Sequence, residues 1–126
     1  MSAPGREAQE ALSWFVGELK RLRQLAGSPS LNTLVAISAA LRQPLARSTL
    51  SDKLNAKSLP DWPFVAAFVG ACLAHADRSG RTLPAELADL SWWDAAHWRL
   101  LQIADAARTE DRLSAERSIT CGHASS

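Results

Sequence analysis

The sequence predicts an all-α protein, and three observations support this. Ala and Leu are abundant while β-branched residues are few, which favours helix over strand. Apolar residues recur at spacings of three and four along much of the chain, as on the buried face of a helix. Pro and Gly fall between these periodic segments. With 126 residues, 47% of them hydrophobic and 21% charged, the chain fits one globular domain with one core.

The first two helices are expected over residues 8–26 and 30–42. The apolar positions of the first are Leu12, Phe15, Val16, Leu19 and Leu22. Gly27 and Pro29 end that pattern. Ser30 is a candidate N-cap for the second helix, because its hydroxyl can accept a hydrogen bond from a free backbone N–H group. The apolar face of the second helix consists of Leu31, Leu34, Val35 and Leu41.

The third helix is expected over residues 48–57, after Pro44. Thr49 followed by Asp52 has the form of a capping box, in which both side chains satisfy free N–H groups at the start of a helix. Leu50 and Leu54 are the only large apolar residues, and we expect both in the core. A helix with so narrow an apolar stripe exposes much of its circumference to solvent or to a partner.

The fourth helix begins after Asp61, with Pro63 in its first turn, and its run FVAAFVGACLAHA predicts burial on several sides. Pro84 can open a short helical segment. Ser91 with Asp94 forms a second capping-box pattern before a last helix over about 91–108. The inward stripe of the last helix is Trp93, Ala96, Leu100, Ile103 and Ala107. Residues 109–126 have little to bury, so we expect one domain over 1–108 followed by a flexible tail.

The charges are unevenly distributed along the chain. Residues 19–60 contain seven basic residues and one acidic residue, whereas the rest contains seven basic and twelve acidic residues. The basic residues of this region are Lys20, Arg21, Arg23, Arg42, Arg47, Lys53 and Lys57, and the acidic one is Asp52. Such asymmetry is typical of a surface that binds a polyanion, although a basic stretch is also often a solvated face.

Two short helices joined by a tight connection and flanked by longer apolar helices fit a helix-turn-helix unit. The stretch ARSTLSDKLNAKSLPDWPFVAAFVGACLA also resembles the recognition-helix half of Cro/repressor-type (XRE-family) domains, and ELKRLRQLAG resembles their first helix. The resemblance is to actinobacterial members in particular and covers about residues 11–74. It implies a five-helix, repressor-like helix-turn-helix bundle that binds double-stranded DNA as a transcription regulator, in the bacterial cytoplasm at the nucleoid.

In such a domain the third helix enters the major groove. The candidate base-contacting residues are Ser48, Thr49, Ser51 and Asn55. The candidate phosphate-contacting residues are Arg23, Arg42, Arg47, Lys53 and Lys57, and Lys20 and Arg21 can add contacts.

A structural explanation of the same residues remains open. Ser48, Thr49 and Asp52 can act as helix caps, and Asn55 and Lys57 can close the helix C-terminus. The chain also departs from the family pattern. Ala56 replaces a glycine, Asp52 replaces a basic or amide residue, and the connection RQPLAR contains a proline.

The chain contains five Trp and no Tyr. Trp93 lies on an apolar stripe and Trp62 can pack at the start of the fourth helix, whereas Trp14 and Trp98 lie off the stripes of their helices. Most of the five are expected in the core, and a neighbouring segment can also cover Trp14 and Trp98. The interface candidates for a homodimer formed through the last helix are Trp14, Trp92 and Trp98. The alternative function is a protein–protein adaptor that keeps the fold without binding DNA. A small-molecule sensor is a weaker third idea.

Catalysis has little support in the sequence. His75, His97 and His123 form no recognisable nucleophile–base set, and there is no glycine-rich phosphate loop. Cys72 and Cys121 form neither a disulfide framework nor a metal quartet, so we expect a buried thiol, histidines at the edge of solvent, and no metal or cofactor. No apolar run reaches the roughly 18–20 residues that cross a bilayer, so we expect no membrane partner.

Overall fold

The computed structural model describes the backbone of residues 4–124 and the side chains of residues 6–108. The all-α, five-helix prediction is confirmed, and residues 4–124 contain no strand. The helices are α1 (Pro4–Leu25), α2 (Leu31–Ala40), α3 (Arg47–Leu54), α4 (Trp62–Arg78) and α5 (Leu90–Ala124). None of them is both long enough and apolar enough to cross a membrane, over the residues described.

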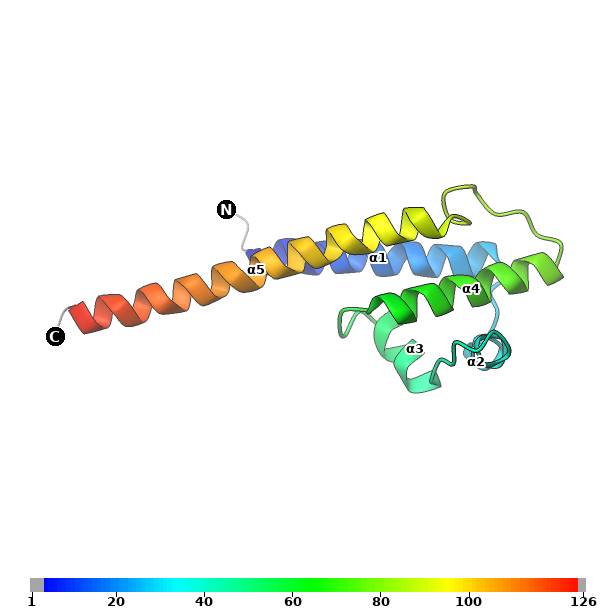
Figure 1. Ribbon diagram of the computed structural model, residues 1–126, viewed down its shortest axis with the longest axis horizontal. Coiled ribbons are helices and arrows are strands. Elements are labelled where there is room, and N and C mark those ends of the chain that lie inside the picture. The colour runs from blue at the N-terminus through cyan, green and yellow to red at the C-terminus, as the bar shows by residue number, and fades with distance from the viewer. Residues whose placement is uncertain (1–3, 125–126) are drawn as a thin grey trace.

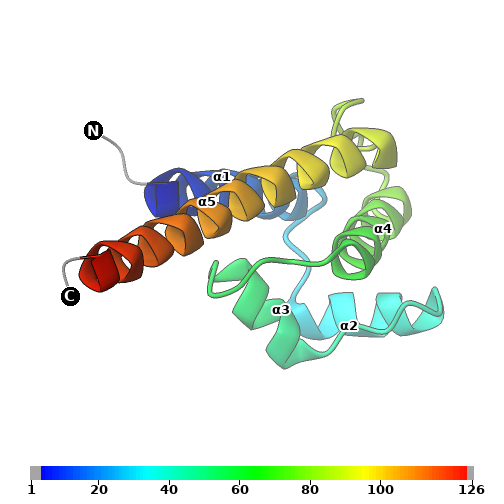
Figure 2. The same ribbon diagram turned by 60° about the vertical axis from the view of Figure 1, so that its left-hand side comes forward.

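The longest helices, α1 and α5, pack side by side and run in opposite directions (Figure 1). The short helices α2 and α3 lie together below α1, α5 and α4 in the views of Figures 1 and 2. α2 packs on α4 and α3, and α3 also contacts α1. The fold therefore separates a layer built from long helices from a pair of short helices at the surface.

One hydrophobic core joins the helices. Phe15, Leu19 and Leu22 of α1 are fully buried, together with Phe68 of α4 and Trp93 of α5. Trp93 packs its indole edge-on against Phe15, with ring centroids 5.7 Å apart. The inward stripes predicted for the first and last helices are confirmed, except that Ala96 and Ile103 are half-buried.

Two of the predicted helix starts are confirmed. The Ser30 side chain accepts a hydrogen bond from the Thr33 N–H at 3.1 Å, and the Asp61 carboxylate accepts one from the Phe64 N–H at the same distance. Pro63 lies in the first turn of α4, as expected. These side chains satisfy backbone donors that the helix itself leaves free.

Both predicted capping boxes are wrong. The N-cap of α3 is Ala46, in extended conformation and without any side-chain hydrogen bond, so the helix begins earlier than Thr49 and Asp52 suggested. At α5, Asp89 rather than Ser91 lies at the cap and accepts a hydrogen bond from the Ser91 N–H at 2.9 Å. A capping pattern in the sequence forms its hydrogen bonds only where tertiary packing places the first turn of the helix at that pattern.

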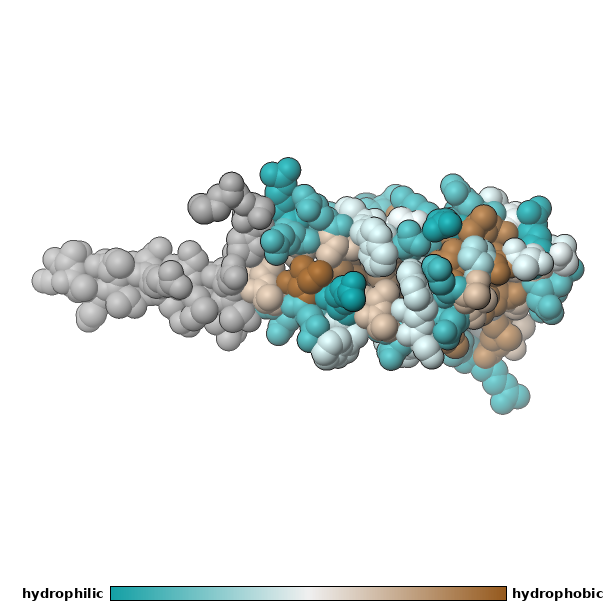
Figure 3. Space-filling model, turned by 90° about the horizontal axis from the view of Figure 1, so that it is seen from above, coloured by the Kyte–Doolittle hydropathy of each residue, from teal (hydrophilic) through white to brown (hydrophobic). Residues whose placement is uncertain are grey.

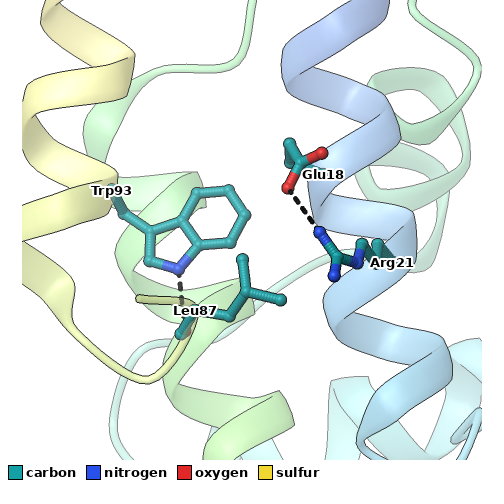
Figure 4. A network of polar contacts seen from close by, with 4 residues as sticks. All are labelled: Glu18, Arg21, Leu87 and Trp93. Atoms are coloured by element: carbon teal, nitrogen blue, oxygen red, sulfur yellow. Dashed lines mark hydrogen bonds and ion pairs between the residues drawn. The ribbon is translucent and has the colours of Figure 1, made fainter. Parts of the chain in front are cut away.

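The segment before α5 forms turns instead of the short helix expected at Pro84. The Trp93 indole N–H donates a hydrogen bond to the Leu87 carbonyl oxygen at 2.9 Å, close to the Glu18–Arg21 ion pair of α1 (Figure 4). Leu87 is itself buried. One buried tryptophan therefore fixes both the loop and the first turn of α5.

The helix α5 does not end near residue 108, where a tail was expected, but continues to Ala124. In Figure 1 its last turns extend past the N-terminal end of α1. Residues 109–121 contain no Pro or Gly, and six of the thirteen are Ala, Leu, Glu or Arg, which have high helix propensity. The prediction used the loss of apolar residues, which limits packing but does not by itself end a helix.

Four helices end in the same Schellman motif, in which two N–H groups bond back to carbonyl oxygens of the last turn. The residue at the left-handed position is Gly27 after α1 and Gly80 after α4. It is Arg42 after α2, with φ 60°, and Ala56 after α3, with φ 56°. After α2 and α3 this position is therefore held by a residue with a side chain, in a conformation that favours glycine, and Ser28, which follows Gly27, also has a positive φ of 53°.

Candidate nucleic-acid interface

The connection between α2 and α3 is fixed by a buried serine. Ser38 is fully buried, donates a hydrogen bond to the Val35 carbonyl oxygen at 2.8 Å, and accepts one from the Leu45 N–H at 3.0 Å. Leu45 is also buried, whereas Pro44 remains exposed. The proline in this connection is thus exposed to solvent, while the buried Ser38 and Leu45 fix the connection to the core. The sequence analysis did not identify this role of Ser38.

The position of α3 is set by its two leucines. Leu50 and Leu54 lie one turn apart and are both buried, as predicted. Ser48, Ser51 and Asn55 lie on the exposed side of the helix. Thr49 is half-buried and faces a hollow between the α2–α3 connection and the start of α4. Three of the four candidate base-contacting residues therefore share an accessible face, and Thr49 lies at its edge.

The amide of Asn55 is bonded within its own helix. Its Nδ2 donates to the Ser51 carbonyl oxygen at 2.8 Å and lies 3.4 Å from the Ser51 hydroxyl. Asn55 is the C-cap residue of α3, in agreement with the structural explanation of this residue. Its side-chain oxygen can still accept a hydrogen bond, but a two-bond contact with adenine requires the amide to rotate away from Ser51.

Asp52 and Lys53 form a network with the segment that follows α3. The Ser58 hydroxyl donates to the Asp52 carboxylate at 2.9 Å, and Lys53 Nζ donates to the Ser58 hydroxyl and to the Leu59 carbonyl oxygen, each at 2.8 Å. Both Asp52 and Lys53 are half-buried. Lys53 was expected at a phosphate, yet here its ammonium group holds the α3–α4 connection in place, a role that depends on residues five and six positions later.

The remaining cations on this side of the molecule are exposed. Arg42, Arg47 and Lys57 lie at the end of α2, the start of α3 and the end of α3, and none forms an ion pair with a carboxylate among residues 6–108. Arg23 differs, because it is half-buried and its Nε donates to the Pro29 carbonyl oxygen at 2.7 Å. Arg47 and Lys57 thus lie at the two ends of α3, and Arg42 lies at the end of α2.

Helix α1 contributes to the same surface. Lys20 and Arg23 line a hollow of about 270 Å³ together with Ser51 and Asn55 of α3. Gln24 and Leu31 complete its walls, with Leu54 at the base. Lys20 is exposed and was considered only as a supplementary phosphate contact. The structure places Lys20 beside α3, although the two are about 30 residues apart in the sequence.

The three interface tryptophans lie at two different places. Trp14 is 51% exposed and packs on half-buried Trp92, with ring centroids 6.2 Å apart, and Trp92 in turn meets Trp93 edge-on at 5.0 Å. Trp98 is 62% exposed, beside a separate groove between α5 and the α3–α4 connection. In the view of Figure 3, hydrophobic residues likewise form separate patches among hydrophilic ones.

The histidine at position 97 is not at the edge of solvent as expected. It is only 4% exposed, its Nε2 lies 2.8 Å from the Pro60 carbonyl oxygen, and its ring packs against Phe15 and Trp62. Because a carbonyl only accepts, Nε2 carries the hydrogen in this contact. His97 therefore links α5 to the segment that follows α3, a contact between residues 37 positions apart.

His75 and Cys72 both lie on α4. The half-buried His75 ring contacts the Ala26 carbonyl oxygen through Nδ1 at 2.8 Å. Burial raises the pKa of the Cys72 thiol from 9.0 to about 12, although the positive charge of Arg23 acts in the opposite direction. Cys72 is buried, as predicted, and remains a thiol at neutral pH. His123 and Cys121 lie outside the described side chains.

The chain has no match among protein-family models, curated proteins or solved structures. A function for the surface around α3 must therefore be argued from its residues and their arrangement.

Proposed function

We propose that this protein is a transcription regulator that binds double-stranded DNA sequence-specifically, with α2 and α3 as a helix-turn-helix unit and α3 as the recognition helix. The proposal includes kinship with Cro/repressor-type (XRE-family) proteins and a place in the bacterial cytoplasm. The observation that carries it is the placement of α3. Leu50 and Leu54 anchor one side of the helix, and the other side is exposed and polar. Arg47 and Lys57, at its two ends, form no ion pair among residues 6–108.

The physical basis is the geometry of the major groove, which admits one α-helix whose N-terminal residues approach the base edges. Ser48 and Ser51 lie on the exposed face of α3, where their hydroxyls can donate or accept. Arg47 at the N-terminus and Lys57 beyond the C-terminus lie where phosphates flank an inserted helix. Phosphate contacts of this kind position the protein, and base contacts give specificity.

Charge reversal tests the proposal. We expect the Arg47→Glu, Lys57→Glu double variant to lose most of its affinity for duplex DNA in a fluorescence-anisotropy titration, because two attractive contacts become repulsive. Arg99→Glu is the matched control, since Arg99 is an exposed arginine on α5, away from α3. Equal affinity of the double variant and the wild type would overturn the proposal.

One observation favours a second function, that of a protein–protein adaptor. Trp98 and Leu101 are exposed next to a groove on α5, a combination common at protein interfaces. An adaptor would retain its partner complex in the Arg47→Glu, Lys57→Glu variant, whereas a DNA-binding regulator would lose its DNA complex. The two functions are therefore separated by the same pair of substitutions.

A further inference from the structure

Helix α5 has an outward stripe in addition to its buried one. The stripe consists of Asp94, Trp98, Leu101, Asp105 and Arg108, all of them exposed. Successive members are separated alternately by four and three residues, the spacing that keeps side chains on one face of a helix and that coiled coils use at their contacts. Trp98 is 62% exposed and Leu101 40% exposed at its centre.

A hollow lies directly beside these two apolar side chains. It measures about 320 Å³ and is lined by Leu59 of the α3–α4 connection and by α5 residues that include Trp98, Leu101 and Ala104. A protruding indole and a shallow hollow, which Gln102, Asp105 and Arg108 also line, are thus neighbours on one surface. A surface with both features can complement a copy of itself, which is what a two-fold symmetric interface requires.

We infer that a second copy of this chain docks on this stripe, with the two α5 helices antiparallel and the two-fold axis passing near Leu101. Residues equally far before and after Leu101 then face each other. Leu101 meets the partner's Leu101. Trp98 meets the small side chain of the partner's Ala104, next to the hollow. Asp94 meets the partner's Arg108, and symmetry forms this ion pair twice.

The charges select the antiparallel arrangement over the parallel one. In a parallel pair each residue faces its own copy, so Asp94, Asp105 and Arg108 would each oppose a like charge. In the antiparallel pair, opposite charges meet at both ends of an apolar centre. A polar rim around a tryptophan-containing centre is the usual composition of a specific protein interface.

This surface concerns the dimer of the proposed regulator and does not depend on DNA binding. His97, next to Trp98 in the sequence, contacts the Pro60 carbonyl oxygen, and Leu59 lines the hollow. The segment that follows α3 therefore adjoins the proposed interface. Dimerisation through α5 would fix the separation of the two α3 helices, which sets the spacing of half-sites on DNA.

Sedimentation equilibrium of the full chain without DNA tests the inference. We expect a concentration-dependent dimer whose dissociation constant rises about tenfold or more in Trp98→Ala, as for a central interface tryptophan. Leu41→Ala is the control and should leave it unchanged, because Leu41 is an exposed apolar residue at the end of α2, outside the stripe. Circular dichroism verifies that each variant remains helical.

A charge swap gives a sharper result. Asp94→Arg alone and Arg108→Asp alone each place like charges together and should weaken the dimer, whereas the double variant restores opposite charges and should dimerise as the wild type does. Arg99→Asp, on another side of α5, should have no effect. A monomeric wild type, or a double variant no better than the single ones, would overturn the inference. A dimer that binds no DNA would refute the proposed function alone.

Discussion

Replacing Arg42 by glycine should make this protein more stable and at the same time weaken the proposed binding to DNA. Arg42 occupies the left-handed position of the Schellman motif that ends α2, with φ 60°. Its side chain is exposed and forms no ion pair within residues 6–108. Glycine adopts this conformation without steric conflict, so the substitution lowers the free energy of the folded backbone while little packing is lost.

The expected magnitude follows from two opposing contributions. A residue with a side chain in the left-handed region costs about 1–2 kcal/mol relative to its preferred conformation. Glycine adds about 0.4–1 kcal/mol of unfolded-state entropy that folding must overcome. The free energy of unfolding of Arg42→Gly should therefore increase by about 0.5–1 kcal/mol, which raises Tm by roughly 2–4 °C in a domain of this size.

Two further variants make the measurement decisive. Gly80→Ala introduces a side chain at the equivalent position after α4, where a Cβ meets nothing within 4 Å, so its expected loss of about 0.5–1 kcal/mol arises from the backbone alone. Arg42→Ala removes the charge but keeps the unfavourable conformation. It should weaken DNA binding as much as Arg42→Gly does without the gain in stability.

Urea unfolding and anisotropy titrations of the same samples provide both readouts. If Arg42→Gly were less stable than the wild type while Gly80→Ala lost stability as expected, the left-handed conformation of Arg42 would not be a source of strain. If Arg42→Gly bound DNA as tightly as the wild type, Arg42 would contact no phosphate.

Three other predictions concern stability and reactivity. Lys53→Met should lower the free energy of unfolding by about 1–3 kcal/mol, because Ser58 loses a charged donor, while the salt dependence of DNA binding stays unchanged; a reduced salt slope would instead place Lys53 at a phosphate. Gly17→Ala should raise stability by about 0.5–1 kcal/mol in thermal unfolding, since this mid-helix glycine has open space around its Cβ position, and a loss would indicate an unrecognised contact. In a Cys121→Ser background, a maleimide should label Cys72 only upon unfolding. Because the folded pKa of about 12 exceeds the ordinary 9.0, the contribution of the Cys72 thiol to stability is complete below pH 9 and is lost between pH 9 and pH 12; labelling of the native protein at pH 7 would contradict its burial.

The features that sequence predicted well depend on neighbouring residues or on periodicity. The caps Ser30 and Asp61 and the buried stripe residues Leu50, Leu54 and Trp93 are all as expected. In each case the signal lies within a few residues of the feature it determines. The apolar period placed Trp14 and Trp98 off the stripes of their helices, which left both a core and an interface position open, and both are exposed.

The features that sequence missed depend on residues distant along the chain or on packing. His97 is buried because the α3–α4 connection covers it, and its Pro60 partner lies 37 positions away. Ser38 stabilises the α2–α3 connection from within a helix, seven residues before Leu45. Asp52 resembled a cap but bonds Ser58, because burial of Leu50 and Leu54 sets where α3 begins.

Prediction of the candidate site from the sequence was limited in the same way. Its members on α3 could be named from the sequence, whereas the engagement of Lys53 by Leu59 and the approach of Lys20 to Ser51 and Asn55 required the fold. The sequence shows that a residue is basic, but not whether its charged group is free to bind a phosphate. Only the structure shows that Lys53 is engaged within the protein whereas Arg47 and Lys57 are exposed.

A salt series measures whether the surface around α3 binds the DNA backbone. The purified protein is titrated by fluorescence anisotropy against pooled random duplex DNA at increasing salt. Each phosphate contact contributes about −0.9 to the log–log slope, so Lys20, Arg42, Arg47 and Lys57 predict a slope of about −4 per protomer. The absence of binding even at low salt would contradict DNA binding through this surface and favour the adaptor function.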